Sequence, residues 1–170
     1  MLKFTAQTPR EEVFVTVRRF LENKGLVIVD HDDRRPWGGY FVIREAQAFA
    51  FIRVFFTNVD PDDFKVYSNL SPKILLVAPG KRLSWQYHNR RSEIWKVIEG
   101  KVAVAVSETD EQSETKQLAP GDIMEIKQGQ RHRLIGLDEW VVIAEVWKHS
   151  DTEHPSDEED IVRVEDDFGR

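Results

Sequence analysis

The sequence predicts a mainly β chain, a double-stranded jelly roll (a double-stranded β-helix) with an N-terminal helical and α+β extension. From residue 72 onward, short runs rich in Val, Ile and aromatic residues alternate with turn signals that contain glycine and proline. Before residue 70, apolar residues recur with a helical period. The 170 residues, 41% of them hydrophobic, suit one domain with its own core. We divide the chain into an extension (1–70), a barrel (71–150) and an acidic linker with a C-terminal segment (151–170).

The extension opens with a helix. Thr8 is the expected N-cap, Pro9 occupies the first position and Glu11 the third. Apolar residues then follow at helical spacing, and Gly25 is the expected stop. After the helix we expect strands at 26–29 and 40–43, a charged turn at 30–35, and a helix rather than a strand over 44–56.

The barrel is expected to contain eight short antiparallel strands, separated by turns such as 78–80, 99–101 and 119–122. The expected strands are 73–77, 82–88, 93–99, 102–107, 114–118, 123–126, 132–135 and 140–147.

The C-terminal twenty residues divide into two parts. Residues 151–160 hold six carboxylates, and we interpret this stretch as a solvated linker. Residues 161–164 alternate like a strand and can add to a sheet.

Composition excludes several classes of function. The net charge of −6 and the lack of a basic tract argue against a nucleic-acid partner. Since there are no cysteines, disulfides and thiolate metal sites are excluded. No run reaches about 18 apolar residues and no secretion signal is present, so we expect a cytoplasmic protein without a membrane partner.

Four side chains predict a metal site. Gln86 and His88 are two apart on an expected strand, so both point to one face. A turn returns the chain with Glu93 toward the same space, and His132 follows in a later strand. A lone histidine is more often a hydrogen-bonded core residue, but four such residues form a nitrogen and oxygen set that suits zinc, manganese, iron or nickel.

The spacing around these residues resembles the two motifs of the cupin family. Gly80 stands six positions before Gln86, and Gly100 stands seven positions after Glu93. Gly121 and Gly129 precede His132 at the spacing of the second motif. This chain has Gln86 where the first motif usually has histidine, Lys127 where proline is common, and Gly136 where asparagine is common.

Three segments also resemble the cupin domain of type II (bifunctional) phosphomannose isomerases. Residues 83–95 are similar to that family's LSLQxHxxRxEHW, and residues 158–170 to its EDDIVRxEDxYGR. Residues 35–40 resemble its RPWGxY. The resemblance implies metal-dependent aldose–ketose isomerisation of mannose 6-phosphate and fructose 6-phosphate through a cis-enediol. It further implies one divalent metal ion, zinc first and manganese, nickel, cobalt or iron as alternatives, a homodimer, and a C-terminal segment that folds back near the active mouth.

Such an isomerase also needs a base and a cationic grip on the phosphate. Glu145 is our candidate base, because it lies in an apolar strand and matches a glutamate of the family; a structural glutamate on the outer barrel face is the alternative. Arg170 and Lys81 are the other catalytic candidates. The candidate phosphate ligands are Arg82, Arg91, Arg131 and Arg163.

Two other classes of function remain open from the sequence. One is a non-catalytic cupin that binds a sugar or a nucleotide-sugar. The other is a different metal-cupin sugar enzyme, such as an epimerase or another isomerase. An oxygenase more often presents three histidines, so Gln86 counts against that reaction.

Overall fold

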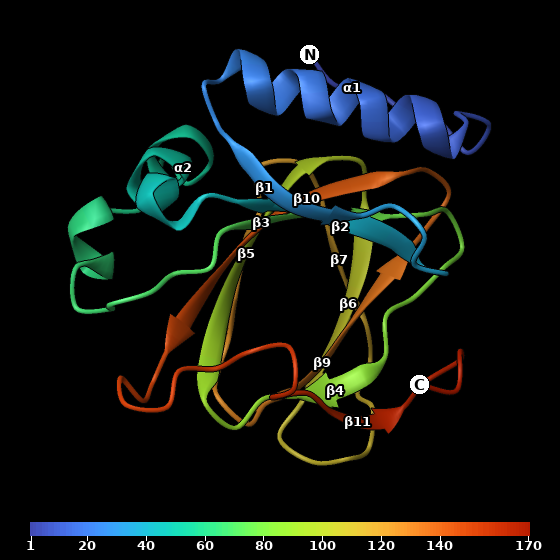
Figure 1. The fold of residues 1–170 in the computed structure, drawn as a ribbon. Coiled ribbons are helices and arrows are strands. Elements are labelled where there is room, and N and C mark those ends of the chain that lie inside the picture. Colours follow the sequence, from blue (N-terminus) through green and yellow to red (C-terminus); the bar gives the residue numbers. More distant parts are fainter.

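The computed structural model describes residues 1–170 as two facing antiparallel sheets with helices against one of them (Figure 1). The predicted fold class is confirmed. The helices are α1 (Arg10–Asn23) and α2 (Ala48–Phe55), with the short 3-10 helices η1 (Glu45–Gln47) and η2 (Pro61–Phe64). The strands are β1 (Ile28–Asp32), β2 (Gly38–Ile43), β3 (Lys73–Val77), β4 (Trp85–Tyr87), β5 (Arg91–Glu99), β6 (Val102–Ser107), β7 (Lys116–Leu118), β8 (Ile123–Ile126), β9 (Arg131–Gly136), β10 (Val141–His149) and β11 (Val162–Glu165).

The two sheets are assembled from segments that are distant in the chain. One has six strands in the order β1-β2-β3-β10-β5-β8, and the other has five in the order β11-β4-β9-β6-β7. The extension therefore lengthens the first sheet, and the C-terminal segment lengthens the second. The glycine at the start of β2 makes its pairing with β3 possible. A Cβ on Gly38 would lie 1.8 Å from the carbonyl oxygen of Leu76, and its φ is +144°.

Two apolar cores lie on opposite faces of the six-stranded sheet. Helices α1 and α2 cover its outer face, where Ile74 and Leu76 of β3 join side chains of both helices (Figure 1). Leu75 and Val77 point the other way, into the barrel. Strand β3 is buried along its whole length because both faces are covered, which explains its unbroken apolar run.

The N-terminal elements differ from expectation in their ends. Helix α1 begins at Arg10, and its N-cap residue is Pro9 rather than the expected Thr8, so the helix has no side-chain cap. The Thr8 hydroxyl accepts the N–H of Thr5 at 2.9 Å instead. Gly25 ends the helix with a φ of +75°, as expected. Strand β1 runs through charged residues as far as Asp32, since a half-exposed edge strand needs no apolar alternation when a neighbouring strand pairs with it. The helix expected within 44–56 is present as η1 and α2.

Strand β4 is shorter than its predicted range of 82–88. Only residues 85–87 form the strand, while Arg82 makes an isolated bridge to Ile135 and Leu83 donates its N–H to Leu134 at 3.0 Å. No helix is long and apolar enough to cross a membrane.

The C-terminal segment is bound closely to the barrel. Ser156 and Asp160 are buried, so the interpretation of 151–160 as a solvated linker is wrong at these two positions, whereas residues 157–159 between them are exposed. Asp160 accepts the N–H groups of Asn89 and Arg90 at 3.0 and 2.9 Å, which explains how so acidic a stretch is held. Strand β11 then pairs with β4 (Figure 1).

Candidate metal centre and adjacent cavity

The four predicted ligands come from both sheets and meet between them. Gln86 of β4 is opposite His132 of β9 in register, and His88 follows directly after β4. Glu93 reaches the same point from β5. The Nε2 atoms of His88 and His132 are 3.2 Å apart, and Glu93 Oε1 lies 3.2 Å from His88 Nε2. Gln86 Nε2 is 3.5 Å from His88 Nε2, so the amide end of Gln86 also borders this point.

Backbone carbonyls hold both imidazoles in one tautomer. His88 Nδ1 lies 2.7 Å from the carbonyl oxygen of Asp160, and His132 Nδ1 lies 2.9 Å from that of Gln130. A carbonyl oxygen can only accept, so each Nδ1 carries a proton and Nε2 is the ring nitrogen that each histidine directs at the centre. Such outer hydrogen bonds commonly orient histidine ligands of a metal.

The charges of the site agree with this arrangement. Burial lowers the pKa of His132 to about 4, so its imidazole is neutral at neutral pH. Burial by itself would raise the pKa of Glu93, but the neighbouring His88 and Arg91 side chains outweigh it and hold that pKa well below its ordinary value. Arg91 Nε donates to Glu93 Oε1 at 2.8 Å. The centre thus combines an ionised carboxylate with a neutral His132 imidazole.

This donor set fits a divalent cation. The ligand atoms of His88, Glu93 and His132 lie within 4.8 Å of one another, and all three side chains are buried. Two Nε2 lone pairs that face each other beside a carboxylate are electrostatically unfavourable without positive charge between them. Arg91 supplies part of that charge, since its Nη2 donates to His88 Nε2 at 3.2 Å. A metal ion would supply the rest, with Gln86 turning its amide oxygen inward.

Glu145 lies beside this centre on β10. Its side chain is buried, and Trp95 Nε1 donates to both Glu145 Oε1 and Glu93 Oε2 at 3.1 Å. Burial, followed by the negative charge of Glu93, raises the pKa of Glu145 to about 8. The ammonium group of Lys73 on β3, which pairs in register with Glu145, opposes this rise. Glu145 therefore carries a proton that it can release near neutral pH.

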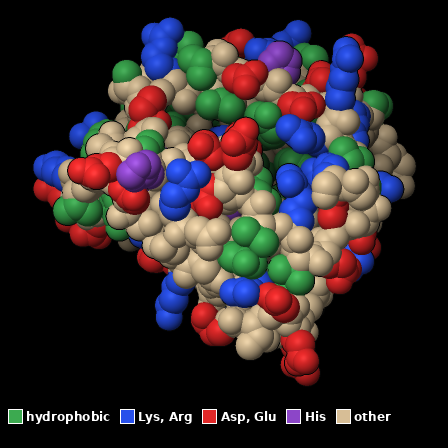
Figure 2. Space-filling view, turned by 60° about the horizontal axis from the view of Figure 1, so that its bottom comes forward, with side chains coloured by type: hydrophobic (Ala, Val, Ile, Leu, Met, Phe, Trp, Pro, Cys, Tyr) green, Lys and Arg blue, Asp and Glu red, His purple; other side chains and the backbone are tan.

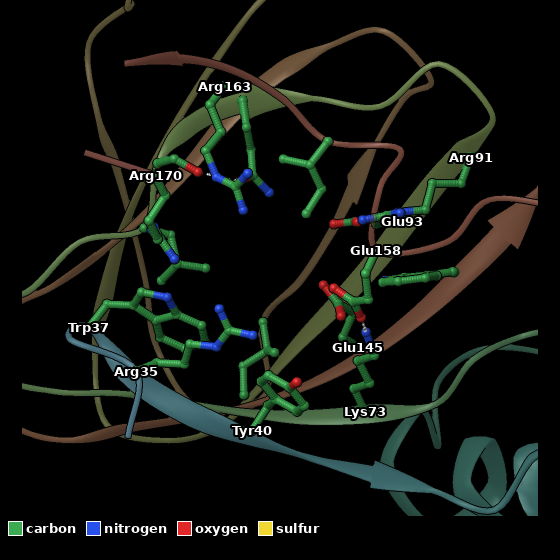
Figure 3. A pocket seen from close by; sticks show the side chains of 16 residues that line it. Arg35, Trp37, Tyr40, Lys73, Arg91, Glu93, Glu145, Glu158, Arg163 and Arg170 are labelled. Atoms are coloured by element: carbon green, nitrogen blue, oxygen red, sulfur yellow. Dashed lines mark hydrogen bonds and ion pairs between the residues drawn. The ribbon is translucent and has the colours of Figure 1, made fainter. Parts of the chain in front are cut away.

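A cavity of about 290 Å³ joins these groups to solvent. Figure 3 shows Glu93, Glu145 and Glu158 on one side of it and Arg35, Arg163 and Arg170 on the other. In the space-filling view, acidic and basic side chains flank the hollow of this face from different sides (Figure 2). The cavity is lined by Arg35, Trp37, Tyr40, Lys73, Leu75, Leu83, Ser84, Gln86, Arg91, Glu93, Glu145, Trp147, Glu158, Ile161, Arg163 and Arg170.

The structure brings only some of the predicted cationic residues to this cavity. Arg163, Arg170 and Arg91 line it, but the Arg91 guanidinium is buried against Trp147 at 3.5 Å and is bonded to Glu93. The other three candidates lie elsewhere. Lys81 is exposed on the surface, Arg82 is paired with Asp167 at 2.6 Å, and Arg131 is paired with Asp110 at 2.7 Å and lies over Tyr87.

Sequence reasoning missed three contributors to the site. Lys73 begins an otherwise apolar strand, and its ammonium group pairs with Glu158. Asp160 orients His88 from a position 72 residues away. Arg35 lines the cavity and stood in the RPWGxY segment without a role. Only Lys73 had a local signal in the sequence, because it is a cation in an apolar strand. The contributions of Asp160 and Arg35 depend on packing between residues far apart in the chain.

Comparison with known proteins gives one family match and several structural likenesses. A family model described as "Mannose-6-phosphate isomerase C-terminal" matches residues 62–166, whereas no curated protein matches the chain. Among solved structures, a recombinant oxalate oxidase in complex with glycolate is 19% identical, with a TM-score of 0.46 over 56% of this chain and 46% of that one. A Bacillus halodurans protein is 13% identical, with a TM-score of 0.45 over 51% of this chain and 67% of that one. A DMSP lyase from Ruegeria pomeroyi is 18% identical, with a TM-score of 0.43 over 54% and 44%.

The alignments with the oxidase and the lyase cover less than half of those chains. The family match, in contrast, spans more than half of the present chain and includes Gln86, His88, Glu93 and His132. The chain is therefore a cupin and belongs to the family of mannose-6-phosphate isomerase C-terminal domains.

Proposed function

We propose that this protein is a metal-dependent isomerase that interconverts an aldose phosphate and a ketose phosphate, with mannose 6-phosphate and fructose 6-phosphate as the first pair to test. The observation that carries the proposal is the position of Glu145. A carboxyl group with a raised pKa lies beside a set of metal ligands, in a cavity whose opposite wall is cationic. Those are the three components that aldose–ketose isomerisation requires.

Gln86, His88, Glu93 and His132 would hold the metal ion, which is zinc in our proposal. When bound there, it would polarise the sugar oxygens at C1 and C2. Asp160 and Gln130 keep both imidazoles aimed at that point through their carbonyl oxygens.

Glu145 would move the proton. Its Oε1 is held by Trp95, and it forms no other hydrogen bond, so Oε2 is available to a ligand in the cavity. In the aldose-to-ketose direction, Glu145 would take the proton from C2 and return it to C1 of the resulting cis-enediol. In the metal-free chain burial raises the pKa of Glu145 to about 8, and the same burial excludes competing water from the proton transfer.

Turnover is the direct test. Chelator-treated protein is reloaded with zinc, manganese, cobalt or nickel in turn, and conversion of mannose 6-phosphate to fructose 6-phosphate is followed against the chelated control. The same reaction in D2O should place solvent deuterium at C1 of the ketose, because a proton held by Glu145 can exchange with solvent. Glu145→Gln should lower kcat by at least about 100-fold, since general acid–base catalysis contributes that much.

Glu125→Gln is the matched control. Glu125 lies on β8 with an exposed side chain paired with Lys148, so its loss should leave turnover unchanged. Absence of turnover with every metal would refute mannose 6-phosphate and fructose 6-phosphate as the substrate pair. The proposal would then pass to a sugar- or nucleotide-sugar-binding cupin or to a different sugar reaction.

A further inference from the structure

A second hollow lies on the outer face of the six-stranded sheet, where helices α1 and α2 meet β5 (Figure 1). It has a volume of about 250 Å³ and shares no lining residue with the cavity beside the metal centre. The two helices meet here through Phe20 and Phe55, whose ring centres are 6.3 Å apart. We call this hollow the outer groove; its lining includes Phe20, Lys24, Val54, Phe55, Lys96 and Ile98.

Lys96 of β5 is the one buried charge in the outer groove. Its neighbours Trp95 and Val97 belong to the core inside the barrel, whereas Ile94 and Ile98 belong to the core beneath the helices. Side chains alternate along a strand, so Lys96 lies on the helix-covered face with Ile94 and Ile98. Only 9% of Lys96 is exposed, although lysine is almost never buried to this degree without a partner.

The other buried cations of this chain all have partners. Lys73 is paired with Glu158, Arg91 with Glu93, and Arg133 with Glu165. Lys96, in contrast, forms no ion pair and no side-chain hydrogen bond. In the sheet it lies opposite Ile123 of β8 and Ala144 of β10, neither of which can pair with an ammonium group. Burial of a charge without a partner is costly, so the position of Lys96 favours an anion from outside the chain.

The surroundings of Lys96 add positive charge and no negative charge. Lys24, in the turn that ends α1, also lines the outer groove, and its Nζ lies 5.7 Å from the centre of the Phe20 ring. No carboxylate lines the groove, although acidic residues outnumber lysine and arginine by 30 to 24 in the chain. The groove therefore combines an apolar lining with two cations.

The helices make this groove a feature of the N-terminal extension. Phe20, Lys24, Val54 and Phe55 all precede residue 62, where the match to the family model begins. The groove is thus built largely from residues outside the matched segment, and its role is separate from that of the metal centre.

We propose that the outer groove binds a small apolar carboxylate, whose carboxylate group pairs with Lys96 and whose hydrocarbon chain lies against Phe20 and Phe55. A single buried ammonium group neutralises one negative charge, which suits a monocarboxylate better than a phosphate dianion. The apolar lining favours a hydrocarbon chain, and a volume of about 250 Å³ restricts that chain to a short one. This inference goes beyond the proposed function and does not depend on it.

Calorimetric titration of hexanoate into the full, metal-free chain tests the site directly. Hexanoate should bind with a Kd of about 1 mM or lower. Acetate has the charge without the chain, and 1-hexanol has the chain without the charge. Each should bind at least about tenfold more weakly than hexanoate, because each makes only one of the two interactions.

Lys96→Met removes the charge and keeps an unbranched side chain of similar length. It should weaken hexanoate binding about tenfold or more, and it should leave 1-hexanol binding within about twofold. The variant should unfold at a temperature no lower than that of the unchanged chain, since it replaces an unpaired buried charge with an apolar group. Lys101→Met is the matched control, because Lys101 is exposed in the turn after β5 and does not line the groove.

Three outcomes would overturn the inference. The unchanged chain may show no hexanoate binding up to about 20 mM, or Lys96→Met may bind hexanoate as Lys101→Met does, in which case the ammonium group of Lys96 only reaches water. The third is that Arg163→Gln, rather than Lys96→Met, weakens binding, which would place the carboxylate in the cavity beside the metal centre.

The result is independent of turnover. Hexanoate binding that depends on Lys96 would support the outer groove even if no sugar phosphate is isomerised. Isomerisation without hexanoate binding would refute the groove alone.

Discussion

Replacing Glu145 by glutamine should change how the stability of the protein depends on pH. The pKa of Glu145 is raised from 4.5 to about 8, first by burial and then by the charge of Glu93. Between these two values the folded chain holds a proton that the unfolded chain has released. The free energy of unfolding therefore falls as the pH rises through this interval, by about 1.4 kcal/mol per pH unit. Below pH 4.5 both states are protonated, and the stabilising effect of the shift is fully present.

Glu145→Gln removes this contribution and keeps the oxygen that accepts from Trp95 Nε1. The variant and the unchanged chain should therefore have similar stability near pH 4.5. By pH 8 the variant should be the more stable of the two, by an amount on the order of 4 kcal/mol. Other titrating groups are common to both proteins and largely cancel in the difference.

Urea unfolding followed by tryptophan fluorescence measures this difference at pH steps from 4.5 to 9. The protein is kept free of metal by a chelator, since a nearby bound cation would also change the pKa of Glu145. A difference curve that stays flat within about 0.5 kcal/mol would refute the protonated, buried carboxyl group, and with it the reasoning that makes Glu145 a base.

Three further outcomes are expected. His132→Ala and Gln86→Ala should each lower the metal content per chain at least about tenfold, as measured by elemental analysis. Circular dichroism should show an intact barrel in both variants. Unchanged metal content in both would contradict the ligand assignment. Asp160→Ala should lower the free energy of unfolding by about 3 kcal/mol, because the N–H groups of the 89–90 turn lose their acceptor, and an effect below about 1 kcal/mol would mean that water replaces the carboxylate. Gly38→Ala should lower the free energy of unfolding by at least about 2 kcal/mol in a thermal or urea unfolding assay, since its Cβ would meet the backbone of Leu76. Gly25→Ala, whose Cβ would lie in open space, should lower it by roughly 1 kcal/mol. Equal losses in the two variants would contradict the close approach of Gly38 to Leu76.

Local patterns predicted the barrel well because its strands obey them. Runs such as 73–77, 102–107 and 123–126 occupy the positions that their apolar residues and flanking turns indicated. The two-residue period of a strand also predicted that Gln86 and His88 face one space. Where the ends were misplaced, as at β1, pairing with β2 overrode the local signal of a charged turn.

The surroundings of the ligands were less accessible to sequence reasoning. From the sequence, Arg82 is a candidate phosphate ligand. In the structure the C-terminal segment folds back, and its Asp167 pairs with Arg82. Arg35 faces the cavity because β2 pairs with β3 and because Arg10 holds the intervening turn. Asp160 is buried, although it belongs to an acidic stretch whose local sequence predicts exposure to solvent. All three depend on contacts between residues far apart in the chain, to which spacing within one segment is blind.

Strand β4, one of the two three-residue strands of the barrel, sets a length for whatever binds beside it. Strand β4 lies between β9 and β11, so His132, Gln86 and Arg163 form a row across three neighbouring strands. Adjacent strands are about 4.8 Å apart, which separates the backbones at the two ends of the row by about 10 Å. Because the hydrogen bonds of the sheet fix this backbone spacing, side-chain motion changes the length of the row only slightly. We expect phosphates that differ only in carbon-chain length to be sorted by their reach, with a two-carbon phosphate bound at one end of the cavity alone.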